Sequence, residues 1–237
     1  MKYKRVILKL SGETLLPDGE KSGISIDAAG RLTGEIKTVL ARGVEVGIVI
    51  GGGNIFRGAV ASKNHHICQA QADRMGMLAT IMNGIALQEA FLASGMDAVC
   101  MSSIAIEGIA QPFDRRQAIR DLEKGRVAIF CGGTGSPFFS TDTAAALRAL
   151  EVNAHVILKG TKVDGVYSAD PNHDPSAKKF DKLSYIDVIK MQLGVMDLTA
   201  ISMCMNHNIP IVVFDIFKAG NLVKVMDGEK LGTVVYG

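Results

Sequence analysis

The chain has 237 residues, 48% of them hydrophobic, which is enough to bury a substantial core as one large domain or two small ones. The formal net charge is +2 and basic and acidic residues are interspersed, which argues against nucleic acid or a membrane surface as a partner. The four cysteines show no paired spacing, the N-terminus lacks the long apolar region of a signal peptide, and no apolar stretch approaches the ~20 residues that cross a bilayer. We therefore expect a cytoplasmic protein with small-molecule partners.

Short runs rich in β-branched residues predict six strands. In chain order they cover residues 6–10, 44–50, 98–101, 127–131, 155–158 and 209–214. Segments with apolar residues at three- and four-residue spacing lie between most of them and predict helices. These cover residues 26–41, 73–93, 115–124, 142–150 and 185–191. The final segment, residues 231–237, predicts an antiparallel edge strand.

Strand and helix therefore alternate along the chain. This pattern predicts an α/β fold with a mainly parallel open sheet sandwiched between helix layers. No linker, internal repeat or low-complexity tract interrupts it, so we expect a single domain over residues 1–237. In open sheets of this kind ligands bind at the carboxyl ends of the strands, and the functional residues are expected there.

Two glycine-rich turns follow predicted strands. Residues 132–142 read GGTGSPFFSTD after the strand at 127–131, and residues 51–54 read GGGN, with Arg57 one helical turn further on. Glycines let backbone amides approach an oxyanion closely, and nearby hydroxyls add donors. A protein that binds one nucleotide needs one such cradle, whereas an enzyme that moves a phosphoryl group between two phosphate-bearing substrates needs two. Either turn taken alone could equally be a tight corner.

The first predicted strand ends in Lys9, Leu10, Ser11 and Gly12, which place an ammonium and a hydroxyl beside a turn glycine. The chain has neither a GxxxxGK[ST] loop nor a GxGxxG pattern, so a nucleotide must be held in another way. Phosphoryl transfer spreads negative charge over the migrating group, and positioned cations, amides and Mg²⁺ supply most of the catalysis. Lys9 and the two turns together favour a phosphotransferase.

Five sequence blocks then occur in the order typical of one family. They are KLSG at 9–12, GGGNIFRG at 51–58, DRMGMLAT at 73–80, GGTGSPFFSTDTAA at 132–145 and TKVDGVYSADP at 161–171. Together they resemble the bacterial uridylate kinases (UMP kinases) of the amino acid kinase superfamily, and the similarity extends to the closing GEKLGTVVY. The resemblance implies an amino acid kinase-like fold, with the UMP side mainly in the N-terminal two thirds and the ATP nucleoside side mainly in the C-terminal third. It also implies ATP-dependent phosphorylation of UMP to UDP in pyrimidine nucleotide biosynthesis.

The resemblance further implies roles for individual residues. Lys9 would be the main catalytic cation, and Asp142 would orient lysines and metal-bound phosphates. The residues implied for ATP binding are Lys9, Leu10, Ser11, Gly12, Gly53, Arg57, Thr161, Tyr167 and Asp170. Those implied for UMP binding are Gly52, Asp73, Thr134, Gly135, Ser136, Pro137, Phe138, Phe139, Ser140 and Thr141. The family usually has Asn at the position of Ser136, whose shorter side chain reduces the reach toward uracil.

The implied reaction is in-line attack of a UMP phosphate oxygen on the γ-phosphorus of ATP. Mg²⁺ would enter as Mg-ATP, with no protein side chain expected as its dedicated ligand. No strong general base is needed, because a phosphate monoester has a second pKa of about 6 and is mostly a dianion near neutral pH. Two polyanions must be brought together, and Lys9, Arg57, Mg²⁺ and the turn amides would offset their repulsion.

Several of these residues also have a purely structural interpretation. Asp142 stands where a helix N-cap belongs, Asp170 precedes a proline as turn residues do, and Tyr167 could be a buried aromatic at a strand end. Methionine fills irregular cores well, so three methionines are expected to pack rather than to touch a ligand. They are Met75, Met77 and Met82.

Lys159 and Lys162 lie near the proposed ATP loop, but strand-end lysines are commonly solvated, so both stay outside the catalytic set. Asp197 is also left outside it. One polar loop carries three residues of metal-binding type, which are His65, His66 and Cys68. No second ligand pair has suitable spacing, which argues against zinc.

Two other functions are weighed against the kinase. A nucleotide sensor of the same fold would bind UMP or UTP without turnover, and the presence of Lys9 and Asp142 argues against it. An acyl-phosphate-forming amino acid kinase would have no reason to carry DRMGM and TGSPFF together. The resemblance also implies an allosteric homohexamer that UTP inhibits and that GTP often activates. GTP activation stays open, because residues 84–100 contain no Lys, Arg or His, although Arg115, Arg116 and Arg126 could compensate.

Overall fold

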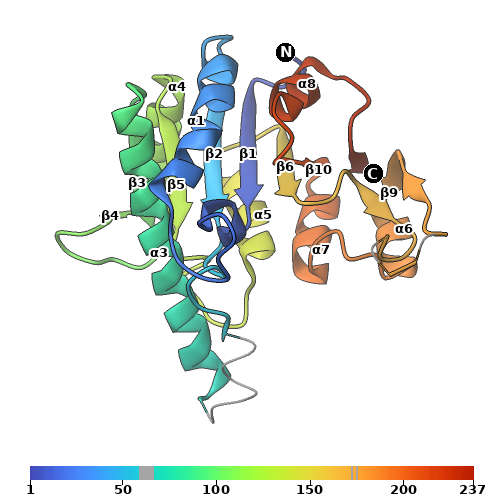
Figure 1. The fold of residues 1–237 in the computed structure, drawn as a ribbon, viewed down its shortest axis with the longest axis horizontal. Helices are drawn as coiled ribbons and strands as arrows, with labels where there is room; N and C mark the ends of the chain where they lie inside the picture. The colour runs from blue at the N-terminus through green and yellow to red at the C-terminus, as the bar shows by residue number, and fades with distance from the viewer. Residues whose placement is uncertain (59–66, 172, 175) are drawn as a thin grey trace.

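A nine-stranded sheet forms the centre of the computed structural model, which describes residues 1–58, 67–171, 173–174 and 176–237 (Figure 1). Its strands follow the order β4-β3-β5-β2-β1-β6-β10-β11-β9. They are β1 (Arg5–Leu10), β2 (Glu45–Ile50), β3 (Ala98–Ser102), β4 (Gln111–Pro112), β5 (Val127–Cys131), β6 (Val156–Thr161), β9 (Lys182–Ser184), β10 (Ile211–Asp215) and β11 (Thr233–Tyr236). All neighbours pair in parallel except β10 with β11. β7 (Val166–Tyr167) and β8 (Lys179–Phe180) form a separate antiparallel pair.

Helices cover both faces of this sheet and enclose two apolar cores (Figure 1). One face packs against α1 (Ile26–Leu40), α3 (Gln69–Ala93) and α8 (Asn221–Asp227). The other packs against α4 (Arg115–Glu123), α5 (Thr141–Glu151), α6 (Tyr185–Lys190) and α7 (Leu198–Asn206). Successive residues of a strand point to opposite faces, so Ile7 joins the second core and Leu8 the first. Burial on both faces explains why the central strands are continuous apolar runs.

The predicted α/β fold, with its mainly parallel sheet between helix layers, is confirmed. All six predicted strands are present with ends shifted by at most three residues, and the strand at 127–131 has the predicted bounds. The five predicted helices are also present, although α3 begins at Gln69 instead of residue 73. The last strand is antiparallel to β10 as expected, but the prediction that it forms the sheet edge is wrong, because β9 pairs with its outer side.

The periodicity did not predict the helices α7 and α8 or the short strands β4, β7, β8 and β9. The strands are only two or three residues long, which is too short for an alternating pattern. The seven-residue α8 begins after Gly220, whose φ of 84° lies in the left-handed region. The 3₁₀ helix η1 (Gly12–Leu15), which directly follows β1, was also not predicted.

The 25-residue helix α3 qualifies the expectation about membrane spans. It is long and apolar enough to cross a bilayer by length and composition alone, with a mean hydropathy of 1.2 in its most apolar window. However, 56% of that window is buried inside the protein, and Phe91 and Leu87 lie in the first core. Core helices of folded domains pass the same test, so this helix is weak evidence for a membrane span.

Candidate active site

The carboxyl ends of four adjacent parallel strands, β5, β2, β1 and β6, meet at one edge of the sheet (Figure 1). β1 leads into Ser11 and η1, β2 leads into residues 51–54, and β5 leads into residues 132–141. The end of β1, which carries Lys9, and both glycine turns therefore lie at the same edge, where ligands of open α/β sheets bind. The topology brings together segments that are more than 100 residues apart in the sequence.

Two lysines hold one carboxylate at this edge. Lys9 and Lys159 are paired positions of the neighbouring strands β1 and β6. Nζ of Lys9 lies 2.8 Å from Oδ1 of Asp142, and Nζ of Lys159 lies 3.1 Å from Oδ2. All three side chains are at most 15% exposed. Lys159 also donates a hydrogen bond to the carbonyl of Val195, so its ammonium is held between the carboxylate and the main chain.

The pKa values of this cluster follow from burial and charge. Burial opposes the ionisation of Asp142, but the charges of Lys9 and Lys159 outweigh it and hold the pKa of the carboxyl below its ordinary value. Burial lowers the pKa of Lys159, and the charge of Lys9 lowers it further, while Asp142 opposes both effects. The cluster therefore keeps an ionised carboxylate between two basic groups at neutral pH.

The sequence suggested that Asp142 is the N-cap of α5, but it is not. Its carboxylate can therefore contact the two lysines. The N-cap is Ser140, whose Oγ accepts hydrogen bonds from the amides of Asp142 at 2.9 Å and Thr143 at 3.3 Å. Asp142 lies in the first turn of the helix, so its carboxylate is not used for capping. The prediction of a capping role for Asp142 is therefore wrong.

Asp197 links the start of α5 to the start of α7. Its carboxylate accepts hydrogen bonds from Oγ of Ser140 and from Oγ1 of Thr143, the latter at 3.0 Å. It also caps α7 by accepting from the amide of Ala200 at 2.9 Å. Asp197 thus fixes the helix that carries Asp142 against the C-terminal part of the chain.

The GGGN turn after β2 is shaped by a buried pair of amides. Nδ2 of Asn54 donates to Oδ1 of Asn83 at 3.0 Å, and Nδ2 of Asn83 donates to Oδ1 of Asn54 at 2.7 Å. Asn83 also donates to the carbonyl of Gly51 at 2.7 Å. A Cβ on Gly12 would lie 2.1 Å from Oδ1 of Asn54, and one on Gly52 would lie 2.7 Å from the carbonyl of Gly76. The close packing around this turn therefore requires glycine at position 12, which lies against it, and at position 52 within it.

The longer glycine turn is fastened to α3. The amide of Phe138 donates to Oδ2 of Asp73 at 2.8 Å, and the amide of Gly132 donates to Oγ1 of Thr80 at 2.7 Å. Phe138 has a φ of 71° and is 72% exposed, and Phe139 beside it is 50% exposed. The structure thus places Asp73 against the loop with which it was grouped in the sequence analysis, and leaves two aromatic rings open to solvent.

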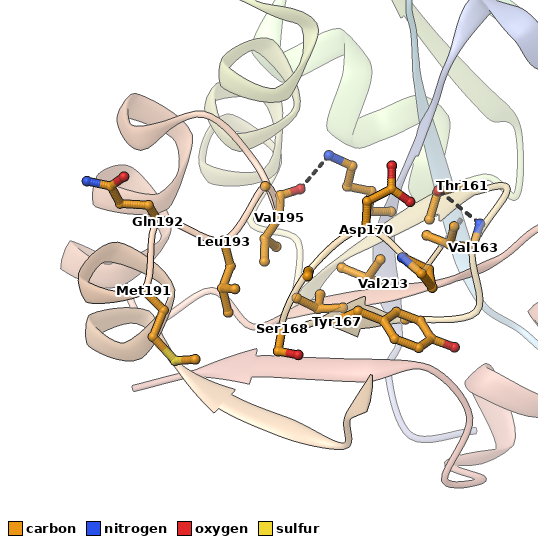
Figure 2. A pocket seen from close by; sticks show the side chains of 16 residues that line it. Thr161, Val163, Tyr167, Ser168, Asp170, Met191, Gln192, Leu193, Val195 and Val213 are labelled. Carbon is orange, nitrogen blue, oxygen red and sulfur yellow. Dashed lines mark hydrogen bonds between the residues drawn. The ribbon is translucent and has the colours of Figure 1, made fainter. Parts of the chain in front are cut away.

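A cavity of about 580 Å³ lies next to the lysine cluster, on the side of the C-terminal strands (Figure 2). We call it the nucleoside cavity. Thr161, Tyr167 and Asp170 all line it, together with the segment from Met191 to Val195. The hydroxyl of Tyr167 donates to Asp164 at 2.7 Å, so this ring is hydrogen-bonded at its tip and is not a fully buried aromatic.

A smaller cavity of about 220 Å³, which we call the phosphate cavity, shares Lys159 and Thr161 with the nucleoside cavity. The residues that line it are Lys9, Ser11, Glu13, Lys159, Gly160, Thr161, Lys162 and Phe217. Three lysines face this space, which favours an anionic ligand. Two of them, Lys159 and Lys162, were left out of the predicted site because strand-end lysines are commonly solvated.

Some predicted residues contribute less than expected or lie outside the described residues. The side chain of Leu10 is fully buried in the first core, so only its main chain can face a ligand. Met77 is buried, whereas Met75 and Met82 are 42% and 53% exposed, so the prediction that all three pack in the core is wrong for those two. His65 and His66 lie outside the described residues. Among the residues that are described, no group of three His, Cys, Asp or Glu could hold a metal ion.

Comparison with known proteins agrees with this geometry. The sequence model of the amino acid kinase family matches residues 4–215. A UMP kinase from Bacillus anthracis has a TM-score of 0.94 and 37% identity over 100% of this chain and 97% of its own, and one from Ureaplasma parvum has 0.92 and 35% over 100% of both. A uridylate kinase from Archaeoglobus fulgidus has 0.72 and 29% over 97% of this chain and 99% of its own. The chain therefore belongs to the amino acid kinase family, in the branch that contains these UMP kinases.

Proposed function

We propose that the chain transfers the γ-phosphoryl group of ATP to UMP and produces ADP and UDP. The observation that carries the proposal is the position of the lysine cluster, which lies between the glycine turns on one side and the nucleoside cavity on the other. Membership of a kinase family and full-length similarity to UMP kinases support the same reaction.

Lys9 and Lys159 are the proposed catalytic cations. In the reaction a phosphate oxygen of UMP attacks the γ-phosphorus in line, and the bond from that phosphorus to the β-phosphate oxygen breaks, which leaves ADP. The acceptor is a dianion near neutral pH, so no side chain has to remove a proton. The two ammonium groups would stabilise the charge of the migrating phosphoryl group, and Asp142 would hold them at a fixed separation.

ATP is proposed to bind across both cavities. The adenosine would occupy the nucleoside cavity beside Thr161, Tyr167 and Asp170, and the triphosphate would occupy the phosphate cavity. The proposed phosphate contacts are Lys9, Ser11, Gly12, the main chain of Leu10, Gly53 and Arg57. This assigns the nucleoside of ATP mainly to the C-terminal third of a single domain.

UMP is proposed to bind on the other side of Lys9, between the two glycine turns. Gly52 and Asp73 would meet its phosphate and ribose, and residues 134–141 would surround the nucleotide. Asp73 already accepts a hydrogen bond from the amide of Phe138, so the ribose and this loop would share one carboxylate. Ser136 would meet the uracil with a shorter side chain than the Asn usual in the family.

The residues at the site fit a magnesium ion carried by ATP. Mg²⁺ is commonly held by one or two carboxylates together with substrate phosphates and water. Asp142 supplies one buried carboxylate, and its Oδ1 is the one buried side-chain oxygen or nitrogen in the described part of the chain that has no hydrogen bond. Lys9 approaches that oxygen as an ion-pair partner at 2.8 Å. When bound, the ion supplies positive charge that offsets the charge of the phosphates.

A homohexamer in the cytoplasm is proposed from the family membership, with one supporting observation. Three apolar side chains lie along one exposed face of α3, at Met75, Leu78 and Met82, and each is between 42% and 53% exposed. An exposed apolar stripe of this kind is typical of a contact between subunits. Inhibition by UTP is proposed on the same basis, whereas activation by GTP stays open. A titration of initial velocity with each nucleotide tests both effects, and a flat response to a nucleotide would rule out its effect.

The proposed function is tested by ADP formation from Mg-ATP with UMP, CMP, acetylglutamate or no acceptor. Turnover with UMP alone is the expected result. Turnover with acetylglutamate would favour an acyl-phosphate-forming kinase, and UMP binding without any turnover would favour a sensor. In the kinase, Lys9→Ala should remove most turnover and leave UMP binding nearly intact.

A further inference from the structure

One carboxylate bridges two basic side chains beside the phosphate cavity. Oε1 of Glu13 lies 2.5 Å from Nη2 of Arg57, and its Oε2 lies 2.9 Å from Nζ of Lys162. The side chain of Glu13 is 26% exposed, and those of Arg57 and Lys162 are 60% and 62% exposed. The bridge therefore lies where the phosphate cavity, which Glu13 and Lys162 line, meets solvent.

The three residues come from three different strand ends. Glu13 is the second residue of η1, and its amide donates to Oγ of Ser11 at 3.3 Å. Arg57 follows the turn after β2 and donates from Nε to the carbonyl of Gly53 at 3.2 Å. Lys162 follows β6. A single side chain thus connects the turn after β2 to the segment after β6.

Glu13 offsets part of the positive charge around the phosphate cavity. The phosphate cavity is lined by Lys9, Lys159 and Lys162, and Glu13 is the one acidic residue among the described residues that line it. Lys162 and Arg57 stabilise the ionised carboxylate and hold the pKa of Glu13 below its ordinary value. A carboxylate and a phosphate offer the same kind of oxygen acceptor to Lys and Arg, so a bound polyphosphate would need the cations that Glu13 occupies.

We propose that Glu13 holds Arg57 and Lys162 as a stand-in for phosphate, and that the triphosphate of the incoming nucleotide competes with it for these two cations. The identity of that nucleotide as ATP rests on the function proposed above. Glu13 is therefore a positioning residue that sets the affinity for polyphosphate. Exposed ion pairs add little to stability, so the loss of this bridge should change ligand binding more than folding.

The test compares Glu13→Gln, which keeps the shape of the side chain and removes its charge, with Glu20→Gln. Glu20 is exposed in the following loop and provides a control for the loss of one negative charge. Calorimetry without UMP measures the affinity for inorganic tripolyphosphate and for Mg-ATP. We expect Glu13→Gln to bind both roughly two- to tenfold more tightly, because two exposed ion pairs no longer compete, and we expect the gain to shrink as salt rises.

Steady-state kinetics then separate competition from a structural effect. In Glu13→Gln the KM for Mg-ATP should fall in parallel with the dissociation constant, while kcat stays within about twofold, since the lysine cluster is unchanged. In a Lys162→Met background the gain from Glu13→Gln should be smaller, because one of the two cations is already missing. Unchanged or weaker tripolyphosphate binding in Glu13→Gln would overturn the proposal.

The two proposals fail in different ways. If the native protein does not phosphorylate UMP but Glu13→Gln still gains affinity for tripolyphosphate, the proposed function fails and the role of Glu13 stands. If UMP is phosphorylated and Glu13→Gln gains no affinity, the role of Glu13 fails and the kinase stands.

Discussion

Lys9 and Lys159 occupy paired positions on neighbouring parallel strands, and their ammonium groups contact different oxygens of the same carboxylate. Two cations so close together repel each other, and Asp142 between them offsets that repulsion while both remain mostly buried. Because one carboxylate faces two ammonium groups, the cluster can still attract the negative charge of a migrating phosphoryl group. This arrangement makes Lys159 as good a candidate for catalysis as Lys9.

We therefore predict that Lys159→Met lowers kcat by about 10²- to 10³-fold, the loss typical when one charge-stabilising donor is removed from a transition state. UMP binding should persist, because the proposed UMP turns lie on the far side of Lys9. Steady-state assays of ADP formation measure kcat, and calorimetry with UMP measures binding. Lys230→Met, at an exposed position, is the control and should retain full activity. A Lys159→Met variant with normal kcat would remove this residue from the catalytic set.

The lowered pKa of Lys159 predicts opposite pH effects on activity and stability. The folded-state pKa lies below the ordinary lysine value of about 10.4, so between these two values the unfolded chain binds more protons than the folded one. The free energy of unfolding should rise with pH across that window, while kcat falls because the ammonium is lost. Lys159→Arg should move the fall in kcat to higher pH, since guanidinium does not titrate there. A pH profile of kcat that is the same in both proteins would contradict this explanation.

The sequence predicted the fold well because the central strands are buried on both faces. The run at 127–131 shows this most clearly, since an uninterrupted apolar segment ended by Gly132 has few other interpretations. The helix α7 was missed because LTAISMCMN has no charged residue to mark a polar face. Asp197, which was considered only as a site residue, is its N-cap. A helix defined mainly by tertiary packing carries little periodicity.

For the site, the blocks that carry the family resemblance were predicted and the contacts between them were not. Lys159 was left out because strand-end lysines are commonly solvated, and nothing in the sequence shows that β6 lies beside β1, which is what brings its ammonium to Asp142. Glu13 received no role, since its partners Arg57 and Lys162 are 44 and 149 residues away in the sequence and nothing local indicates the contact. Pairing between distant strands determines these contacts, and local sequence does not encode it.

Two glycines of α3 should respond in opposite ways to alanine. A Cβ on Gly84 would lie 2.8 Å from Sγ of Cys100 and 3.1 Å from Cβ of Cys131, in a part of the core where the two sulfurs are 3.4 Å apart. Gly84→Ala should therefore lower the free energy of unfolding by about 1 to 3 kcal/mol. A Cβ on Gly76 would meet no atom within 4 Å, so Gly76→Ala should raise it by up to about 1 kcal/mol through helix propensity. Denaturant unfolding of both variants measures the difference, and equal effects would show that the core around Gly84 can accommodate a methyl group.

The stripe on α3 predicts how the proposed assembly can be broken. Met82→Glu places a charge at the end of the exposed apolar face formed with Met75 and Leu78, so it should dissociate the oligomer without unfolding the subunit. Ile186→Glu introduces the same charge at an exposed apolar residue of α6 and should leave the assembly intact. Sedimentation velocity measures the mass of each. An unchanged mass of Met82→Glu would show that the subunits meet elsewhere.

The hydrogen-bonded side chains of Asn54 and Asn83 beneath the GGGN turn lead to a prediction about stability. Asn83→Ala removes both hydrogen bonds to Asn54 and the one to the carbonyl of Gly51. Each buried polar group left unpaired costs about 1 to 3 kcal/mol, so the free energy of unfolding should fall by about 2 to 4 kcal/mol. Asn54→Ala should cost a similar amount, since it leaves Asn83 short of a partner. The double variant should cost less than the two single losses added together, because the interaction is already absent after the first change. Additive losses would mean that the two side chains stabilise the turn independently, and the kinetics of the variants would then show whether the shape of the turn matters for turnover at all.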